Sequence, residues 1–209
     1  GMACLYNETI QLVALESSGI KTITDLKGKK VSVGAAGSGT EANARQILES
    51  AGLTYNDIKV QYLSFGESAS NMKDGYIDAA FNTAGIPTAA IQDLAVSKKM
   101  VLVPIDGQVA TKLMAKYPFY ALQIVPAGTY QGQNQNVTTV AVKSMLAVSS
   151  KLSGDLVYKM LETMYANTDR LIAAHSQGKN IKIESALEGM SIPLHPGAEK
   201  YFKEKGVLK

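Results

Sequence analysis

"VSVGAAGSGTEANAR", residues 31–45, runs from β-branched residues through a turn of glycines and other small residues into a pattern typical of a helix. A run of small residues adds little to a core, but it allows a backbone to come close to another group. The stretch therefore predicts a strand, a tight turn and a helix. The group above the turn is a phosphate, a carboxylate or the neighbouring chain.

The strand-and-helix pattern repeats as far as about residue 126. Apolar strands are expected at 31–34, 60–65, 77–82, 100–105 and 120–125. A helical pattern follows each of the first four strands, and glycines end the first two of these helices. Near-continuous apolar strands joined by helices are typical of a parallel sheet that is covered on both faces. We therefore expect an α/β fold class, with a mostly parallel, five-stranded lobe over 28–136.

Two more strands, at 5–15 and 137–143, are expected to enter and leave this lobe. The chain after the second of them is almost wholly helical, most clearly over 153–174. Three parts are thus predicted: 1–17 with the strand that enters the lobe, 18–136 with the lobe itself, and 137–209 with the return strand and with helices that belong to another unit.

Composition and charge restrict the class of protein. The 209 residues carry a net charge of +3, and 46% of them are hydrophobic. No segment is long and apolar enough to span a bilayer, and the lysines are scattered, which disfavours nucleic acid as a partner. The single cysteine, Cys4, excludes an internal disulfide. Nothing links Cys4 with the two histidines, His175 and His195, so neither a metal site nor a catalytic triad is predicted.

The helix after the glycine turn is predicted to start at Ser38, because Glu41 follows three residues later in the capping-box pattern. The N–H groups of Gly39 and Thr40 then lack partners and attract an anion. A Walker phosphate loop would have a lysine where Thr40 stands, and "GAAGSG" has alanine at the second glycine of a dinucleotide fingerprint. A single carboxylate, which needs only two or three donors, fits better. The alternative is a plain turn in which Ser38 only caps its own helix.

A second turn lies in "FNTAGIPTAAI", residues 81–91. The preceding strand is expected to end at Asn82, Gly85 allows the chain to turn, and Pro87 suits a first helical turn. In the doubly wound order the first strand lies between the second and the third, so both turns would flank the point where ligands bind. The alternative is again a plain connection between a strand and a helix.

Four segments resemble the TAXI-type solute receptors of TRAP transporters: "SGIKTITDLKGKKVSVGAAGSGTEANARQILESAGL", "DAAFNTAGIPTAAIQDLA", "YPFYALQIVPAGTYQGQ" and "LHPGAEKYFKEKG". They occur in the right order, and the resemblance covers essentially the whole chain. It implies a type II periplasmic-binding-protein-like fold, in which two lobes joined by hinge strands close over a small acid. Known ligands of that family are of the glutamate, glutamine and 2-oxoacid kind.

The resemblance implies that Ser38, Gly39 and Thr40 meet a ligand carboxylate, with the second turn nearby. The candidate ligand-binding residues are therefore Gly37, Ser38, Gly39, Thr40, Asn82, Thr83, Gly85 and Pro87. The implied function is that of an extracytoplasmic, periplasmic subunit that delivers its solute to a membrane permease, with no catalysis and no cofactor.

A full receptor of this family also has an export signal and a long N-terminal segment upstream of the part that this chain resembles. The resemblance therefore implies that 18–136 is a complete second lobe, that 1–17 is a hinge strand with a remnant of lobe one, and that 137–209 is the return hinge strand with helices of lobe one. These helices would then lack their partner lobe. Their apolar residues Leu156, Met160, Met164 and Leu171 are expected to be covered by another chain, so self-association through 144–209 is predicted.

Two other classes of protein remain as alternatives. The effector-binding domain of a transcription regulator shares the two-lobed fold and would need a helix-turn-helix module upstream. A small-molecule enzyme would need paired catalytic groups, whereas the aspartates at element ends are more typical of caps: Asp25, Asp74 and Asp78. Three tyrosines are expected either to line a wet cleft or to be half-buried in the core: Tyr117, Tyr120 and Tyr130.

Overall fold

The computed structural model describes residues 1–208 and divides the chain into two compact units. The larger unit is Glu8–Val142, and the smaller one consists of Gly1–Asn7 together with the segment from Lys143 onward. Strands β1 (Ala3–Leu15) and β7 (Val137–Leu146) each run from one unit into the other. The two units are described separately below.

Strands and helices alternate in the larger unit, close to the predicted ranges. The strands are β2 (Lys30–Ser32), β3 (Lys59–Gln61), β4 (Ala79–Ala84), β5 (Met100–Val103) and β6 (Ala121–Val125). The helices are α1 (Gly39–Ser50), α2 (Phe65–Lys73), α3 (Ala89–Ser97) and α4 (Gly107–Lys116). Short 3₁₀ turns precede β2 and β3, at η1 (Glu16–Ser18), η2 (Ile23–Leu26) and η3 (Tyr55–Asp57).

The strands form one sheet in the order β3-β2-β4-β1-β7-β6, in which β5 also pairs with β1. Strand β2 pairs in parallel with β3 and β4, which is the doubly wound order. Strand β1 pairs antiparallel with β4 and with β5, so β2, β3, β4 and β5 share one direction. The α/β fold class is confirmed, but the sheet is mixed and has seven strands, because β1 and β7 join it and β6 pairs antiparallel with β7.

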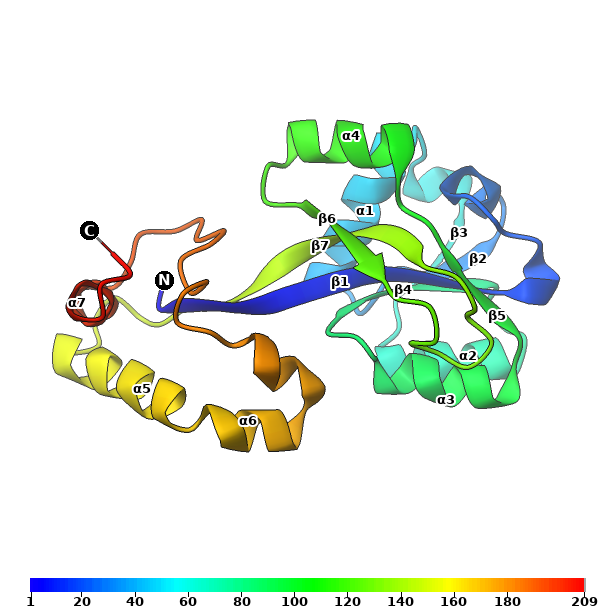
Figure 1. Ribbon diagram of the computed structural model, residues 1–209. Helices are drawn as coiled ribbons and strands as arrows, with labels where there is room; N and C mark the ends of the chain where they lie inside the picture. Colours follow the sequence, from blue (N-terminus) through cyan, green and yellow to red (C-terminus); the bar gives the residue numbers. More distant parts are fainter. Residues whose placement is uncertain (209) are drawn as a thin grey trace. The chain divides into compact units, whose positions relative to one another are not determined.

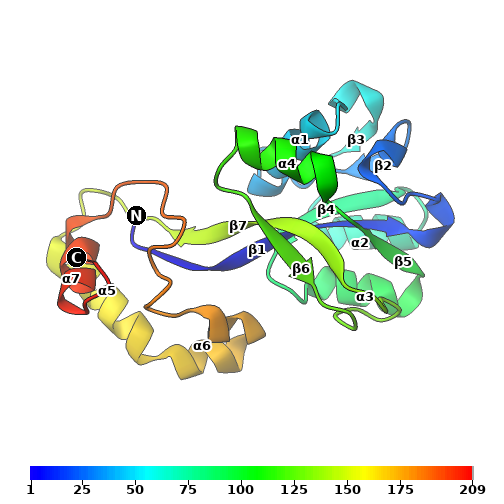
Figure 2. The same ribbon diagram turned by 45° about the horizontal axis from the view of Figure 1, so that its top comes forward.

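The central place of β1 follows from its burial. Residues 9–14 are all buried, which requires cover on both faces of the strand. Helices α1 and α4 cover one face of the sheet, and α2 and α3 cover the other (Figures 1 and 2). Since side chains alternate along a strand, Ile10 and Leu12 pack with α1 and α4, whereas Val13 packs with α2 and α3.

The smaller unit is built around the packing of α5 (Gly154–Ala166) against α7 (Pro196–Glu204). Its core holds Val157 and Leu161 of α5 with Tyr201 and Phe202 of α7. The two helices meet at glycines: a Cβ on Gly197 would lie 2.2 Å from the carbonyl oxygen of Gly154. No other residue fits there without moving backbone atoms.

One prediction for the tail is wrong. The helix expected over 153–174 is broken at Asn167, whose side chain donates to the carbonyl of Thr163 at 2.8 Å, so that α6 (Thr168–Ala174) is separate and is followed by η4 (Ser176–Asn180). The apolar face that was expected to lack a partner within the chain is exposed in part. Leu156 and Met160 are 48% and 38% exposed, because α7 covers the neighbouring face of α5. Self-association through 144–209 stays a prediction.

A candidate ligand-binding cleft

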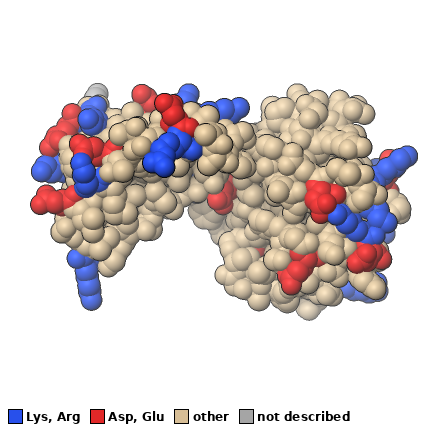
Figure 3. Space-filling model, turned by 90° about the horizontal axis from the view of Figure 1, so that it is seen from below, with Lys and Arg blue, Asp and Glu red and all other residues tan. Residues whose placement is uncertain are grey.

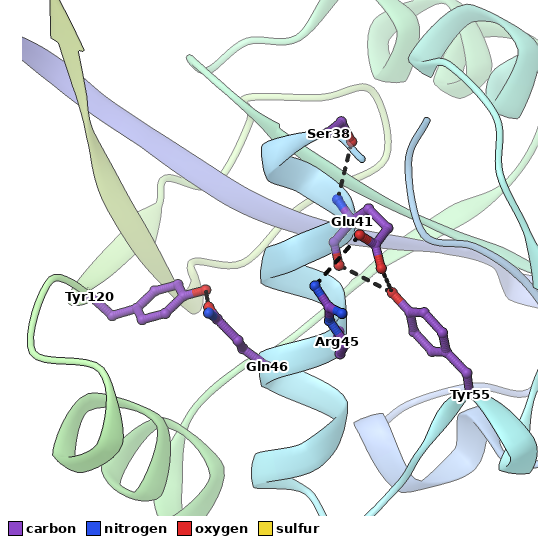
Figure 4. A network of polar contacts seen from close by, with 6 residues as sticks. All are labelled: Ser38, Glu41, Arg45, Gln46, Tyr55 and Tyr120. Atoms are coloured by element: carbon purple, nitrogen blue, oxygen red, sulfur yellow. Dashed lines mark hydrogen bonds and ion pairs between the residues drawn. The ribbon is translucent and has the colours of Figure 1, made fainter. Parts of the chain in front are cut away.

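Helix α1 begins as predicted, with Ser38 as its N-cap in extended conformation (φ −77°, ψ 162°). The Ser38 hydroxyl oxygen accepts a hydrogen bond from the N–H of Glu41 at 3.2 Å. The reciprocal half of the capping box is absent, which corrects the sequence prediction. Figure 4 shows the reason: the Glu41 carboxylate accepts from the Tyr55 hydroxyl at 2.7 Å and lies 3.7 Å from the guanidinium of Arg45. Burial, together with this hydrogen bond, raises the pKa of Tyr55.

The first turn of α1 keeps free donors. The N–H groups of Gly39 and Thr40 and the hydroxyl of Thr40 form no hydrogen bond within the described chain. Gly39 is exposed, whereas Thr40 is only 6% exposed. The free N–H groups mark the positive end of the α1 dipole, which therefore faces any group that approaches Gly39 and Thr40 from solvent.

The glycine turn allows close approach of another group, and part of the space is taken by Thr40 of the same chain. Gly34 has φ +94°, and a Cβ there would lie 2.8 Å from both Cβ and Cγ2 of Thr40. Gly34 thus lets Thr40 lie against the end of the strand. Gly37 has φ +73° with no atom near its missing Cβ, so this glycine serves the turn alone.

A cleft of about 350 Å³ opens beside the start of α1. One side is formed by a single face of α1, with Gly39, Thr40, Ala42, Asn43 and Gln46. The rest comes from Thr83 of β4, Glu8 of β1, Val142 of β7 and Phe119 in the loop before β6. Because β1 lies between β4 and β7, Glu8 is placed between Thr83 and Val142 at this end of the sheet.

A chain of hydrogen bonds fixes the polar wall of the cleft. The Thr83 hydroxyl donates to Asn43 Oδ1 at 3.0 Å, and Asn43 Nδ2 donates to the Tyr120 hydroxyl oxygen at 2.6 Å. The Tyr120 hydroxyl in turn donates to Gln46 Oε1 at 2.5 Å (Figure 4). Burial raises the pKa of Tyr120 to about 12, against the lowering effect of the Asn43 donor. The wall is therefore neutral, polar and held in one orientation at neutral pH.

Most of the second predicted turn lies outside the cleft. Asn82 is 2% exposed, and its side chain donates to the Ala80 carbonyl at 3.4 Å. Helix α3 begins at Ala89 with Thr88 as its N-cap, so the expectation that Pro87 lies in the first helical turn is wrong.

The polar groups of that turn are used within the protein. The Gly85 carbonyl accepts from the Thr88 hydroxyl at 3.0 Å, and the Thr88 N–H donates to the Tyr130 hydroxyl oxygen at 2.9 Å. The Tyr130 hydroxyl donates to the side-chain oxygen of Gln11, and Gln11 Nε2 donates to Thr88 at 2.9 Å. This buried network holds the turn against β1. Two of the tyrosines considered for a wet cleft, Tyr120 and Tyr130, are buried instead.

Of the predicted site residues, Gly39, Thr40 and Thr83 line the cleft, and Ser38 caps the helix beside it. The prediction missed the other lining residues: Glu8, Ala42, Asn43, Gln46, Phe119 and Val142. The sequence held a signal for two of them, because Asn43 and Gln46 recur on the Gly39–Thr40 face at helical spacing. Glu8, the one charged residue of β1, was a second signal.

Both histidines bind backbone groups close to them and lie outside the lining of the cleft. His195 is the N-cap of α7: its Nδ1 accepts from the N–H of Gly197 at 3.2 Å, and its Nε2 lies 3.2 Å from the Leu152 carbonyl. His175 Nδ1 accepts from the N–H of Gln177.

Within residues 1–208, no three His, Cys, Asp or Glu side chains are grouped as metal ligands would be, and no helix could cross a bilayer. On the face drawn in Figure 3, both units carry basic and acidic side chains interspersed with neutral ones.

Comparison with known proteins gives one family over nearly the whole chain. The model described as "NMT1-like family" matches residues 2–206.

Solved structures resemble the chain more weakly. The periplasmic aliphatic sulphonate binding protein SsuA from Escherichia coli is 16% identical, with a TM-score of 0.46 over 97% of this chain and 60% of that one. A protein described as an L-cystine ABC transporter from Listeria monocytogenes is 20% identical, with a TM-score of 0.49 over 86% of this chain and 63% of that one. The amino acid binding protein AbpA of Streptococcus pneumoniae, bound to L-arginine, is 17% identical, with a TM-score of 0.41 over 86% and 61%.

The chain thus spans about three-fifths of the length of these relatives.

Proposed function

Because the chain belongs to the NMT1-like family, we propose that it is the solute-binding part of a membrane transporter and that its cleft holds the carboxylate of a small solute. The observation that carries the proposal is the first turn of α1. There the N–H groups of Gly39 and Thr40 and the Thr40 hydroxyl have no partner among residues 1–208, and both residues line the cleft.

These donors suit one carboxylate better than a larger anion. Three hydrogen bonds to a charged oxygen contribute roughly 1.5–3 kcal/mol each, and the helix dipole adds to them. Among the described residues, no lysine, arginine or histidine lines the cleft to balance the charge of a phosphate. Tyr120 holds Asn43 and Gln46 in place, and the amide and hydroxyl groups of Thr83, Asn43 and Gln46 line the cleft where the remainder of the solute would lie.

The finer assignment follows the resemblance of the sequence to TAXI-type receptors. We propose that the protein acts outside the cytoplasm, in the periplasm, and delivers its solute to the permease of a TRAP transporter. Glutamate, glutamine and 2-oxoacids are the proposed solute classes. Strands β1 and β7, which both run between the units, would be the hinge strands of the predicted three-part organisation.

The structure offers less to the alternative functions. An enzyme needs a nucleophile, or an acid and a base, within reach of the substrate. Of the residues that the structure describes, Glu8 is the one with an ionisable side chain in the lining of the cleft. No feature of the described residues favours the effector domain of a regulator over a transport subunit.

Calorimetry with L-glutamine, L-glutamate, 2-oxoglutarate and an alkanesulfonate tests the proposal. Thr40→Val keeps the shape and the backbone donor but removes the hydroxyl, so the Kd of the bound solute should rise about tenfold. Gly39→Asp, which places a carboxylate at the anion position, should abolish binding.

A matched control is Thr111→Val on α4, where an exposed hydroxyl donates only to the Gly107 carbonyl. This variant should bind like the wild type. If Thr40→Val and Gly39→Asp also do so, the glycine turn is a plain turn and the proposal fails.

A further inference from the structure

Phe119 is a large apolar side chain that stays half exposed within the cleft. It lies in the loop before β6, and 49% of it is exposed, whereas its neighbour Tyr120 is only 4% exposed. Two smaller apolar residues, Ala42 and Val142, line the same cleft. An aromatic ring that is exposed in a concave site offers apolar area for a bound molecule to cover.

Two tyrosines hold the Phe119 ring in place. Its centroid lies 4.9 Å from that of Tyr120, with 33° between the ring planes, and 5.8 Å from that of Tyr117, with 45° between the planes. Tyr120 is itself fixed, because its hydroxyl is hydrogen-bonded to Asn43 and Gln46 of α1. The ring is therefore already positioned before a solute binds, so that little side-chain freedom is lost on binding.

The tie through Tyr120 also places Phe119 at a distance from the proposed carboxylate position. Asn43 and Gln46 follow Thr40 by three and six residues on α1. At a rise of 1.5 Å per residue, this is about 4.5–9 Å along the helix from the free donors. Acetate, with one carbon–carbon bond of about 1.5 Å, is too short to reach across this distance, whereas an extended chain of six carbons spans about 6 Å.

We infer that Phe119 is a specificity-determining residue that packs against the carbon chain of the solute, so that the cleft selects carboxylates with an apolar chain of about four to six carbons over shorter acids. The inference rests on the proposed function, since it assumes that the carboxylate is held at Gly39 and Thr40. It concerns the carbon chain and leaves any further polar group of the solute to the polar wall of the cleft. The driving force is the removal of the ring and of the chain from water.

Acetate, butanoate and hexanoate test this, because they share the carboxylate and differ only in the chain. NMR titration of the whole chain should show the amides of Gly39 and Thr40 shifting with each acid that binds, and the ring protons of Phe119 shifting only with the longer ones. A fully buried methylene is worth about fourfold in Kd, so four methylenes that are half buried exceed tenfold. Hexanoate should therefore bind at least about tenfold more tightly than acetate.

Phe119→Ala removes the ring and should lose most of the preference for hexanoate over acetate. Phe119→Leu restores an apolar side chain and should recover part of it. The matched control is Leu122→Ala, which truncates an apolar side chain that is 57% exposed on β6 and lies outside the lining of the cleft. This control should keep the wild-type preference. Circular dichroism melting curves show whether each variant is folded.

The outcomes separate the two claims. If the wild type binds acetate and hexanoate equally well, or if folded Phe119→Ala keeps the preference, the role of Phe119 is refuted and the carboxylate site stands. Saturation by hexanoate where acetate does not saturate counts as the expected preference. If Phe119→Ala does not fold, the wild-type comparison and Phe119→Leu decide. If none of the three acids shifts the amides of Gly39 and Thr40, the proposed function is overturned together with the inference.

Discussion

Gly34 and Gly37 lie in the turn before α1, and Gly39 is the first residue of that helix. The three glycines are constrained differently, and alanine substitutions should show the difference. Gly34 combines φ +94° with a Cβ position 2.8 Å from Thr40, so Gly34→Ala meets both backbone strain and overlap. Strain of about 1–2 kcal/mol and overpacking of about 1–3 kcal/mol add to about 2–5 kcal/mol. Gly37→Ala meets only the strain at φ +73°, about 1–2 kcal/mol. Gly39 lies in the helix with open space around it, so Gly39→Ala should stabilise the fold by about 0.4–1 kcal/mol.

Urea unfolding followed by circular dichroism measures the three changes in the free energy of unfolding. Hydrogen exchange at the amides of α1 assigns them to the larger unit. The expected order of stability is Gly39→Ala, wild type, Gly37→Ala and Gly34→Ala, from highest to lowest. If Gly34→Ala costs no more than Gly37→Ala, Thr40 does not pack against Gly34, and the account of how the turn positions Thr40 is refuted.

Three further outcomes are expected. Gly197→Ala should destabilise the smaller unit by about 1–3 kcal/mol or more, because its Cβ would meet a backbone oxygen of α5 at 2.2 Å. Unchanged hydrogen exchange in α5 and α7 would contradict this. Tyr120→Phe should cost about 1–3 kcal/mol of unfolding free energy, since it leaves the buried Asn43 amide without its acceptor; a loss below about 0.5 kcal/mol would refute the hydrogen-bond chain. Hydrogen bonds from backbone N–H groups, and for the last residue chiefly from the Ser64 side chain, lower the pKa of the capping carboxylates Asp25, Asp57 and Glu67. Their contribution to stability is therefore complete above the ordinary carboxyl pKa of about 4 and is lost as the pH falls through the lowered values. NMR titration midpoints at or above about 4 would show that the folded state does not lower these pKa values.

The sequence was a good guide to local elements and a poorer one to their pairing. Apolar runs and glycine punctuation predicted each strand and helix of the larger unit to within a few residues. That β1 inserts antiparallel between β4 and β5 could not be read from the pattern, because a strand buried on both faces has the same apolar run in either direction. The break at Asn167 was missed because hydrophobic spacing continues across it.

Only part of the site was predicted, because some of its residues are set by local sequence and others by the pairing of the strands. Helix capping is a local property, so the start of α1 and its free donors at Gly39 and Thr40 could be predicted from Ser38 onward. Glu8 and Phe119 reach the same cleft from distant parts of the sequence, and only the sheet order brings them together. The second turn was misjudged because its polar groups are bound by Gln11 and Tyr130, whose approach depends on the tertiary fold.

The most direct test of the central claim is an NMR titration that follows each backbone amide of the larger unit as L-glutamine, L-glutamate or 2-oxoglutarate is added. New hydrogen bonds to a carboxylate shift the proton resonance of the donating N–H. The account predicts that the largest saturable shifts occur at Gly39 and Thr40. Saturable binding that leaves these two amides unchanged while shifting others, such as those of residues 85–88, would contradict it.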